Sequence, residues 1–230
     1  MYNKIFKRVL DIIISLTALL ILLPLFIPVV FILKFTGENE VLYFQKRVGK
    51  NLIEFEIIKF ATMLKNSPNL GDGIYTADED FRILKFGKFL RKTKINELPQ
   101  IFNILFGNMS IVGPRPLIKE TFKFYKETER EKISSIKPGL TGISSIFFSQ
   151  EDKILKNSKN KETFYKEKIA PLKKSLELYY INNQSFYLDF KIIVCTALKI
   201  SRMSNKKIMN FFPGIKTEIL KIEQLEKLIF

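Results

Sequence analysis

The sequence of 230 residues contains no histidine, no tryptophan and a single cysteine. Without histidine, the chain lacks the usual proton shuttle of neutral pH and the commonest metal ligand, which excludes histidine-based triads and histidine-rich zinc sites. One cysteine cannot form an intrachain disulfide, and Cys195 lies in an apolar run where we expect a buried or lipid-facing thiol. Any catalysis must therefore use carboxylates, amides, hydroxyls, lysine or arginine.

Acidic residues are also scarce relative to basic ones. The chain has 23 Asp and Glu residues against 38 Lys and Arg residues, so the formal net charge is +15. Such a surface suits phosphates, anionic lipids or nucleic acid. Because no nucleic-acid-binding module is recognisable and the basic residues cluster near apolar segments, we expect a membrane as partner and no nucleic acid.

The longest apolar run, residues 12–33, carries no charge and has the length of a membrane-spanning helix. It does not end in a small-residue cleavage site, which argues against a secretory signal peptide. Basic residues flank both ends, whereas a straight span is expected to carry them mainly on one side. Pro24 and Pro28 lie inside the run, and each removes a backbone donor. We therefore predict a re-entrant membrane helix that bends at these prolines, with a kinked span as the alternative.

The rest of the chain predicts an α-rich α/β protein. Residues 41–48 and 53–60 are rich in β-branched and aromatic residues, and turn residues separate them, so we predict a short β-hairpin. Apolar periodicity predicts helices, some of them amphipathic and suited to a membrane interface, at residues 83–92, 96–107, 120–133, 175–181 and 186–200. Loops are expected at residues 65–78, 107–116, 137–142 and 152–161. We divide the chain into a membrane helix with its basic flank (1–36), a small cytoplasmic domain (37–200) and an amphipathic tail (201–230).

The strongest local signal for chemistry lies around Asn96-Glu97. A helix that starts there would direct unpaired N–H groups and a positive dipole end toward an anion such as a diphosphate. Arg91 precedes this pair, and Arg115 follows between two prolines that restrict the backbone, which suits a fixed guanidinium for phosphate. The alternative is structural: Asn96 would be a helix cap, Glu97 a first-turn residue and Arg91 part of a solvated face.

Several longer segments resemble the bacterial sugar transferases, the family of monotopic phosphoglycosyl transferases. The matching segments, in order, are KRVLD, VLYFQKRVGKN, FEIIKFATM, FGKFLRKTKINELPQIFNILFGNMSIVGPRP, IKPGLTG and LELYYINNQSFYLDFKIIVCTA. The resemblance covers roughly residues 1–200. It implies transfer of a sugar-1-phosphate from a nucleotide diphosphosugar, expected to be a UDP-sugar, to polyprenol phosphate. It also implies Mg²⁺ as cofactor, a monotopic location at the cytoplasmic face of the bacterial inner membrane, and a role in starting polysaccharide or glycan assembly.

The resemblance also assigns roles to single residues. The catalytic Asp-Glu dyad of the family falls on Asn96-Glu97, which would also hold the metal. Residues implied in substrate binding are Arg91, Pro114, Arg115, Pro116 and Glu177. Residues implied at the membrane entry and lipid phosphate are Lys7, Arg8, Asp11 and Pro24.

Four departures from the family pattern bear on activity. Asn96 stands where the nucleophilic aspartate is expected, Asn108 replaces another aspartate, Ala61 replaces an arginine, and ISSIFFSQEDKIL replaces the sugar-recognition pattern after PGLTG. Because an amide is a poor nucleophile, an active enzyme would need Glu97 as the attacking carboxylate. The alternative is a non-catalytic family member that binds nucleotide sugar or lipid phosphate as an assembly subunit. The sequence leaves the sugar, the pathway and the oligomeric state open.

Overall fold

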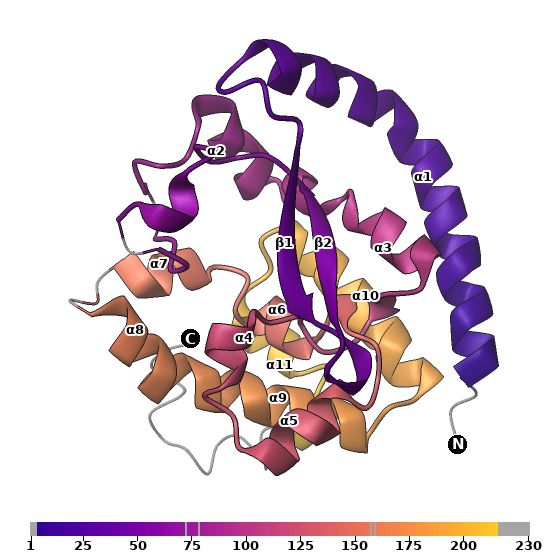
Figure 1. The fold of residues 1–230 in the computed structure, drawn as a ribbon. Helices are drawn as coiled ribbons and strands as arrows, with labels where there is room; N and C mark the ends of the chain where they lie inside the picture. Colours follow the sequence, from indigo (N-terminus) through magenta and orange to yellow (C-terminus); the bar gives the residue numbers. More distant parts are fainter. Residues whose placement is uncertain (1–3, 72, 78, 157, 159, 216–230) are drawn as a thin grey trace.

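The computed structural model describes residues 4–71, 73–77, 79–156, 158 and 160–215 (Figure 1). Within these ranges the protein is helix-rich, with two small sheets and one long N-terminal helix, α1 (Lys4–Phe35), that runs along one side of the domain. The α-rich α/β class predicted from the sequence is confirmed to this extent. Of the predicted amphipathic tail (201–230), residues 216–230 lie outside the described residues.

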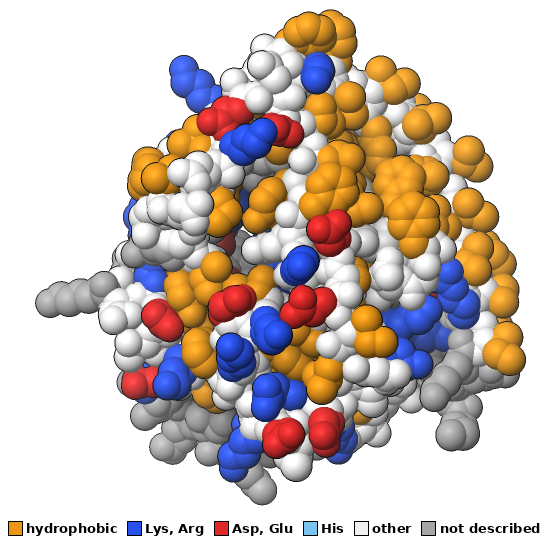
Figure 2. All heavy atoms as spheres, in the orientation of Figure 1, with side chains coloured by type: hydrophobic (Ala, Val, Ile, Leu, Met, Phe, Trp, Pro, Cys, Tyr) orange, Lys and Arg blue, Asp and Glu red, His pale blue; other side chains and the backbone are white. Residues whose placement is uncertain are grey.

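Helix α1 is continuous over its full length and contains both Pro24 and Pro28. The prolines lie four residues apart and therefore on one face, so both lost hydrogen bonds fall on the same side and favour curvature over a break. Figure 1 shows the helix curving over the top of the domain. Most of its apolar side chains are exposed and form an apolar surface (Figure 2). By length and composition this helix could cross a membrane, while the hairpin-like re-entrant topology remains a prediction.

The predicted β-hairpin is confirmed. Strands β1 (Leu42–Val48) and β2 (Glu54–Phe60) pair antiparallel, from Leu42 opposite Phe60 to Val48 opposite Glu54. The turn η1 (Lys50–Leu52) joins them, with Asn51 in the left-handed region at φ 55°. Asparagine tolerates this conformation better than most residues, so the turn chemistry read from the sequence explains the geometry.

A second, parallel sheet contradicts two of the predicted loops. Strand β3 (Ser110–Val112) pairs with β4 (Gly139–Thr141), which follows it after roughly thirty residues. Two further backbone hydrogen bonds extend this pairing: Gly113 N–H donates to Thr141 O (3.0 Å), and Gly139 N–H donates to Pro114 O (2.8 Å). A Cβ at Gly139 would lie 2.1 Å from Gly113 N, so the close approach requires glycine there. This pairing fixes the start of the Pro114-Arg115-Pro116 segment.

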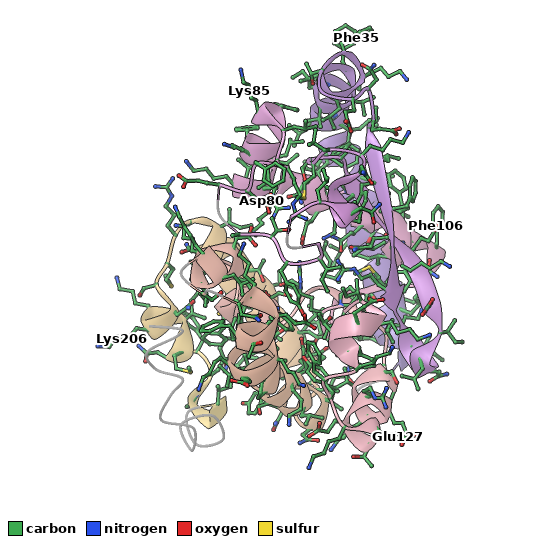
Figure 3. All side chains as sticks on the ribbon, turned by 60° about the vertical axis from the view of Figure 1, so that its left-hand side comes forward. Phe35, Asp80, Lys85, Phe106, Glu127 and Lys206 are labelled. Atoms are coloured by element: carbon green, nitrogen blue, oxygen red, sulfur yellow. The ribbon has the colours of Figure 1, made fainter. Side chains whose placement is uncertain are left out.

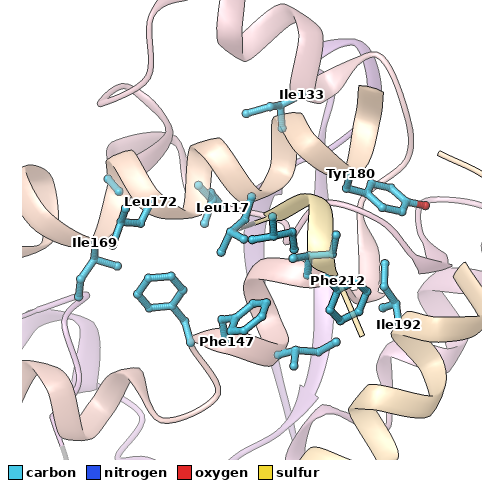
Figure 4. Packing of buried hydrophobic residues seen from close by; sticks show 14 of the residues in the cluster. Leu117, Ile133, Phe147, Ile169, Leu172, Tyr180, Ile192 and Phe212 are labelled. Atoms are coloured by element: carbon cyan, nitrogen blue, oxygen red, sulfur yellow. The ribbon is translucent and has the colours of Figure 1, made fainter. Parts of the chain in front are cut away.

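The remaining helices form the core and cover the sheets. Their bounds are α2 (Lys85–Lys92), α3 (Gln100–Phe106), α4 (Lys119–Phe122), α5 (Glu127–Ser134), α6 (Ile143–Phe147), α7 (Glu151–Lys156), α8 (Lys161–Phe164), α9 (Ala170–Asn182), α10 (Phe186–Ile200) and α11 (Asn205–Met209). The main core cluster packs α6 against α9 and α10, with Tyr180 and Ile192 fully buried (Figure 4). Cys195 is buried in the same cluster.

The helix predictions were correct for α10, whose bounds match, and for the position of α9. The single helix predicted over 120–133 is wrong, because α4 and α5 are separate and each begins after an extended residue, Ile118 and Lys126. The solvated excursion predicted over 152–161 instead contains most of α7. The predicted boundaries between the membrane helix, the domain and the tail remain predictions.

Candidate functional site

A cavity of about 550 Å³ lies between the β1–β2 hairpin, the loop before α2, helix α7 and the segment after β3. On the face shown in Figure 2 the surface is hollowed between α2 and α7. The loop before α2 continues past Asp80 to Lys85, where α2 begins (Figure 3). Eight Lys or Arg residues and four Glu or Asp residues line the cavity. Its excess of cations suits an anionic ligand.

Glu97 lies at the centre of the charged groups in this cavity. It ends the short turn η3 (Ile95–Glu97), and its Oε1 contacts Lys59 Nζ at 3.1 Å and Arg115 Nη2 at 2.9 Å. Burial alone would raise the pKa of the Glu97 carboxyl, but Arg115 and Lys59 outweigh burial and hold this pKa well below its usual range. Glu97 is therefore an anion at neutral pH. Both cations contact the same oxygen, Oε1.

Lys59 and Arg47 were not identified from the sequence. Both lie in the hairpin and line the cavity, where burial lowers the pKa of Lys59 to about 8 and that of Arg47 to about 10. Arg47 donates to Pro116 O (3.2 Å), so the hairpin also supports the Arg115 segment. A sequence signal for Arg47 did exist. Tyr43, Gln45 and Arg47 are alternate residues of β1, and alternate residues of a strand share one face, so these three polar side chains are expected on the same side of the hairpin.

Asn96 and Glu97 do not start a helix, contrary to the sequence prediction. They belong to the short 3-10 helix η3, whereas the α-helix α3 begins only at Gln100, after Pro99 at its N-cap. The helix-dipole argument therefore does not apply. Asn96 is 7% exposed and lines the cavity, and its Oδ1 has no hydrogen-bond partner among the described residues. A buried amide oxygen left unpaired is costly, so this atom suits a donor or a cation brought by a ligand.

Arg115 is held in place by its backbone as well as by its side chain. Its N–H donates to Glu177 Oε1 at 3.0 Å, and Ser144 Oγ donates to the same oxygen. Burial raises the pKa of Glu177 to about 7, although the hydrogen bonds from Ser144 and Arg115 oppose the rise. Pro114 and Pro116 restrict the flanking backbone. Glu177 does not line the cavity, so it acts through Arg115.

Arg91, the other predicted phosphate ligand, lies at the opposite wall of the same cavity. It projects from the last turn of α2, and its Nη2 contacts Asp152 Oδ2 of α7 at 2.9 Å. Thus Asn96, Glu97, Arg91 and Arg115 line one cavity, while their roles in catalysis and substrate binding remain predictions.

The residues predicted at the membrane entry lie outside this cavity and bind α1 to the domain. Lys7 pairs with Asp189 of α10 and contacts Tyr180 Oη at 3.1 Å. Arg8 donates to the carbonyls of Ile104 (2.5 Å) and Leu105 (2.8 Å), near the C-terminal end of α3.

Asp11 makes the third attachment. Its Oδ1 accepts from Ser110 Oγ at 3.0 Å and from Ile111 N at 2.9 Å. Pro24 lies further along α1. The side chains of Arg8 and Asp11 thus have partners within the domain, and a direct role of any of these residues at a lipid phosphate remains a prediction.

For a metal, the described residues contain no group of three or more His, Cys, Asp or Glu side chains. Mg²⁺ usually takes only one or two protein carboxylates and completes its shell with water and substrate phosphates. The carboxylate of Glu97 and the unpaired Oδ1 of Asn96 are oxygen ligands of this kind, so the residues present fit Mg²⁺ in the company of a diphosphate.

Comparison with known proteins finds relatives that are named as sugar phosphate transferases or as exopolysaccharide production proteins. The chain is 35% identical to a UDP-glucose:undecaprenyl-phosphate glucose-1-phosphate transferase of Klebsiella pneumoniae over 201 residues, which are 86% of this chain and 40% of that protein. It is 31% identical to the exopolysaccharide production protein ExoY of Sinorhizobium fredii, covering 86% of this chain and 87% of the relative. A UDP-N-acetylgalactosamine-undecaprenyl-phosphate N-acetylgalactosaminephosphotransferase of Aeromonas hydrophila is 32% identical, with 84% of this chain and 43% of the relative covered.

The chain thus spans less than half the length of the Klebsiella and Aeromonas relatives and most of the length of the Sinorhizobium protein. The family description of bacterial sugar transferases matches residues 2–203. This match includes α1, both sheets and every residue of the cavity described above, and the chain therefore belongs to the bacterial sugar transferase family.

Proposed function

We propose that this protein transfers a sugar-1-phosphate from a UDP-sugar to polyprenol phosphate, the first step of exopolysaccharide or glycan assembly. The relatives' names supply the reaction class and the nucleotide. The observation that carries the proposal is the Glu97 carboxylate, ionised between Lys59 and Arg115 in a basic cavity of about 550 Å³. An anionic diphosphate fits this balance of charge, and a carboxylate is the nucleophile that the chemistry requires.

In the proposed reaction a Glu97 oxygen attacks the phosphorus that bears the sugar. The bond from this phosphorus to the bridging oxygen breaks, UMP leaves with that oxygen, and an acyl phosphate that carries the sugar forms on Glu97. An oxygen of polyprenol phosphate then attacks the same phosphorus and releases the Glu97 carboxylate. Arg115 and Arg91 stabilise charge on the phosphates. Mg²⁺, bound by Glu97 and Asn96 together with the diphosphate, would supply further charge neutralisation.

The proposal places the protein at the cytoplasmic face of the bacterial inner membrane. Helix α1 exposes apolar side chains along most of its length, which supports insertion into lipid. The re-entrant topology is part of the proposal, because Lys and Arg flank both ends of the apolar run. Helix α10 exposes Phe186, Tyr187 and Phe190, and these residues suit a membrane interface.

A second candidate function follows from Asn96. Because the family's nucleophilic position carries an amide here, and the remaining carboxylate is neutralised by two cations, the site also fits a subunit that binds nucleotide sugar without turnover.

One experiment separates the two functions. Purified protein in nanodiscs is incubated with undecaprenyl phosphate, Mg²⁺ and a panel of labelled UDP-sugars, and label in the lipid fraction and released UMP are counted. We expect transfer that requires Mg²⁺ and Glu97, lost in Glu97→Gln and retained in the matched control Glu79→Gln, whose partner Lys156 is partly exposed. Nucleotide binding without any transfer across the panel would favour the non-catalytic subunit.

A further inference from the structure

Helix α7 forms one wall of the cavity, and it lies in the segment that departs from the family's sugar-recognition pattern. Ion pairs connect it to three other parts of the domain. Glu151 pairs with Lys173 of α9, Asp152 with Arg91 of α2, and Lys156 with Glu79 in the loop before α2. The carboxylates of Glu151 and Asp152 therefore both lie in the cavity wall.

The two carboxylates differ in how firmly they are held. Glu151 pairs with the buried Lys173, whose ammonium also lies 5.2 Å from the centre of the Tyr165 ring. The pair of Asp152 and Arg91 is more open, with side-chain exposures of 44% and 24%. A partly exposed pair is weak, so a stronger anion can take the place of one partner.

A donor diphosphate is such an anion. In the proposed function Arg91 binds phosphate, and its guanidinium is the group that Asp152 Oδ2 contacts at 2.9 Å. When the diphosphate takes Arg91, Asp152 remains at the cavity wall without this cation, next to the bound donor. A carboxylate in that position accepts hydrogen bonds from sugar hydroxyls and repels a second carboxylate.

We propose that Asp152 selects the donor sugar: it favours neutral sugars and disfavours uronic acids, whose carboxylate would lie beside its own. This inference rests on the proposed function, because it needs a nucleotide diphosphosugar in the cavity. In the empty cavity Asp152 pairs with Arg91, and the diphosphate of UDP must displace it. The same side chain therefore weakens the binding of UDP, which has no sugar.

Calorimetry with UDP, UDP-glucose and UDP-glucuronate tests the proposal on the whole 230-residue chain in nanodiscs. We expect the wild type to bind UDP-glucose at least about tenfold more tightly than UDP-glucuronate, because two like charges in contact at a partly exposed site repel each other by about this much or more. Asp152→Asn should remove most of this ratio and tighten UDP binding. Asp152→Glu keeps the charge and should retain the ratio. Glu79→Gln removes a different ion pair of α7 and is the matched control.

A ratio that is the same in wild type and Asp152→Asn would overturn the selection by Asp152. A wild type that prefers UDP-glucuronate would overturn it as well. The proposed function fails in a different way: if UDP binds neither the wild type nor any variant, or binds Arg115→Ala as tightly as wild type, the cavity is not a nucleotide site and the selection falls with it.

Discussion

Glu177→Gln tests how the buried support of Arg115 contributes to stability. Glu177 is 3% exposed, and burial raises its pKa from 4.5 to about 7. Oε1 accepts from Arg115 N and Ser144 Oγ, whereas Oε2 has no hydrogen-bond partner among the described residues. Glutamine keeps the shape and can still accept both hydrogen bonds, but it cannot titrate.

The sign of the effect follows from the raised pKa. Below pH 4.5 the carboxyl is protonated in both the folded and the unfolded state, and its contribution to stability is fully present. As the pH rises through about 7 this contribution is lost, because the unfolded state ionises more readily. At about 1.4 kcal/mol per pH unit, the wild type should lose about 3 kcal/mol of unfolding free energy relative to Glu177→Gln across this range.

The assay is chemical unfolding in detergent micelles, followed by far-ultraviolet circular dichroism between pH 4.5 and pH 8. In the Glu177→Gln variant the introduced amide nitrogen would occupy the place of the unpaired Oε2, at a pH-independent cost of about 1–3 kcal/mol, so the pH dependence is the diagnostic quantity. The control Glu120→Gln, at an exposed position, should run parallel to the wild type. Parallel curves for wild type and Glu177→Gln would refute the reasoning.

Three further predictions concern the site and the membrane helix. Asn96→Asp should keep the fold and raise the transferase rate, measured as label in the lipid fraction, because the resemblance implies an aspartate as nucleophile at this position; a rate equal to or below that of wild type would contradict this. Arg115→Ala should weaken UDP-sugar binding by about 1.5–3 kcal/mol in calorimetry, while Lys123→Ala, at an exposed lysine, should change it little; equal effects would remove Arg115 from the site. In a cysteine-free background, cysteines placed at Asn3 and at Glu38 should both be protected from an impermeant reagent outside intact cells, and labelling of only one would show a straight span.

The sequence was informative about elements whose signal is local. The hairpin follows from β-branched and aromatic runs around a turn, and α10 follows from a long apolar periodicity beginning at the cap Ser185, whose hydroxyl accepts from Leu188 N. Strands β3 and β4 have only three residues each, and they form because Gly113 and Gly139 allow two distant segments to approach. No local pattern encodes that approach.

The candidate site was likewise predicted only in part from the sequence. Asn96, Glu97 and Arg115 do line one cavity, yet the predicted helix start at Asn96 is wrong. No sequence pattern singled out Lys59, and only the packing of β2 against η3 brings it to Glu97. The pairing of Arg91 with Asp152 joins residues 61 positions apart, which sequence spacing alone cannot reveal.

The attachments of α1 have a consequence for the timing of synthesis. Lys7 leaves the ribosome first, but its partner Asp189 follows 182 residues later, and the Ser110 partner of Asp11 follows 99 residues later. At about 5–20 residues per second, Lys7 waits on the order of 10–40 s for its counter-charge. During that interval the bilayer must hold a helix whose attachment points on the domain have not yet been made. Docking of α10 therefore completes the attachment of α1 to the domain.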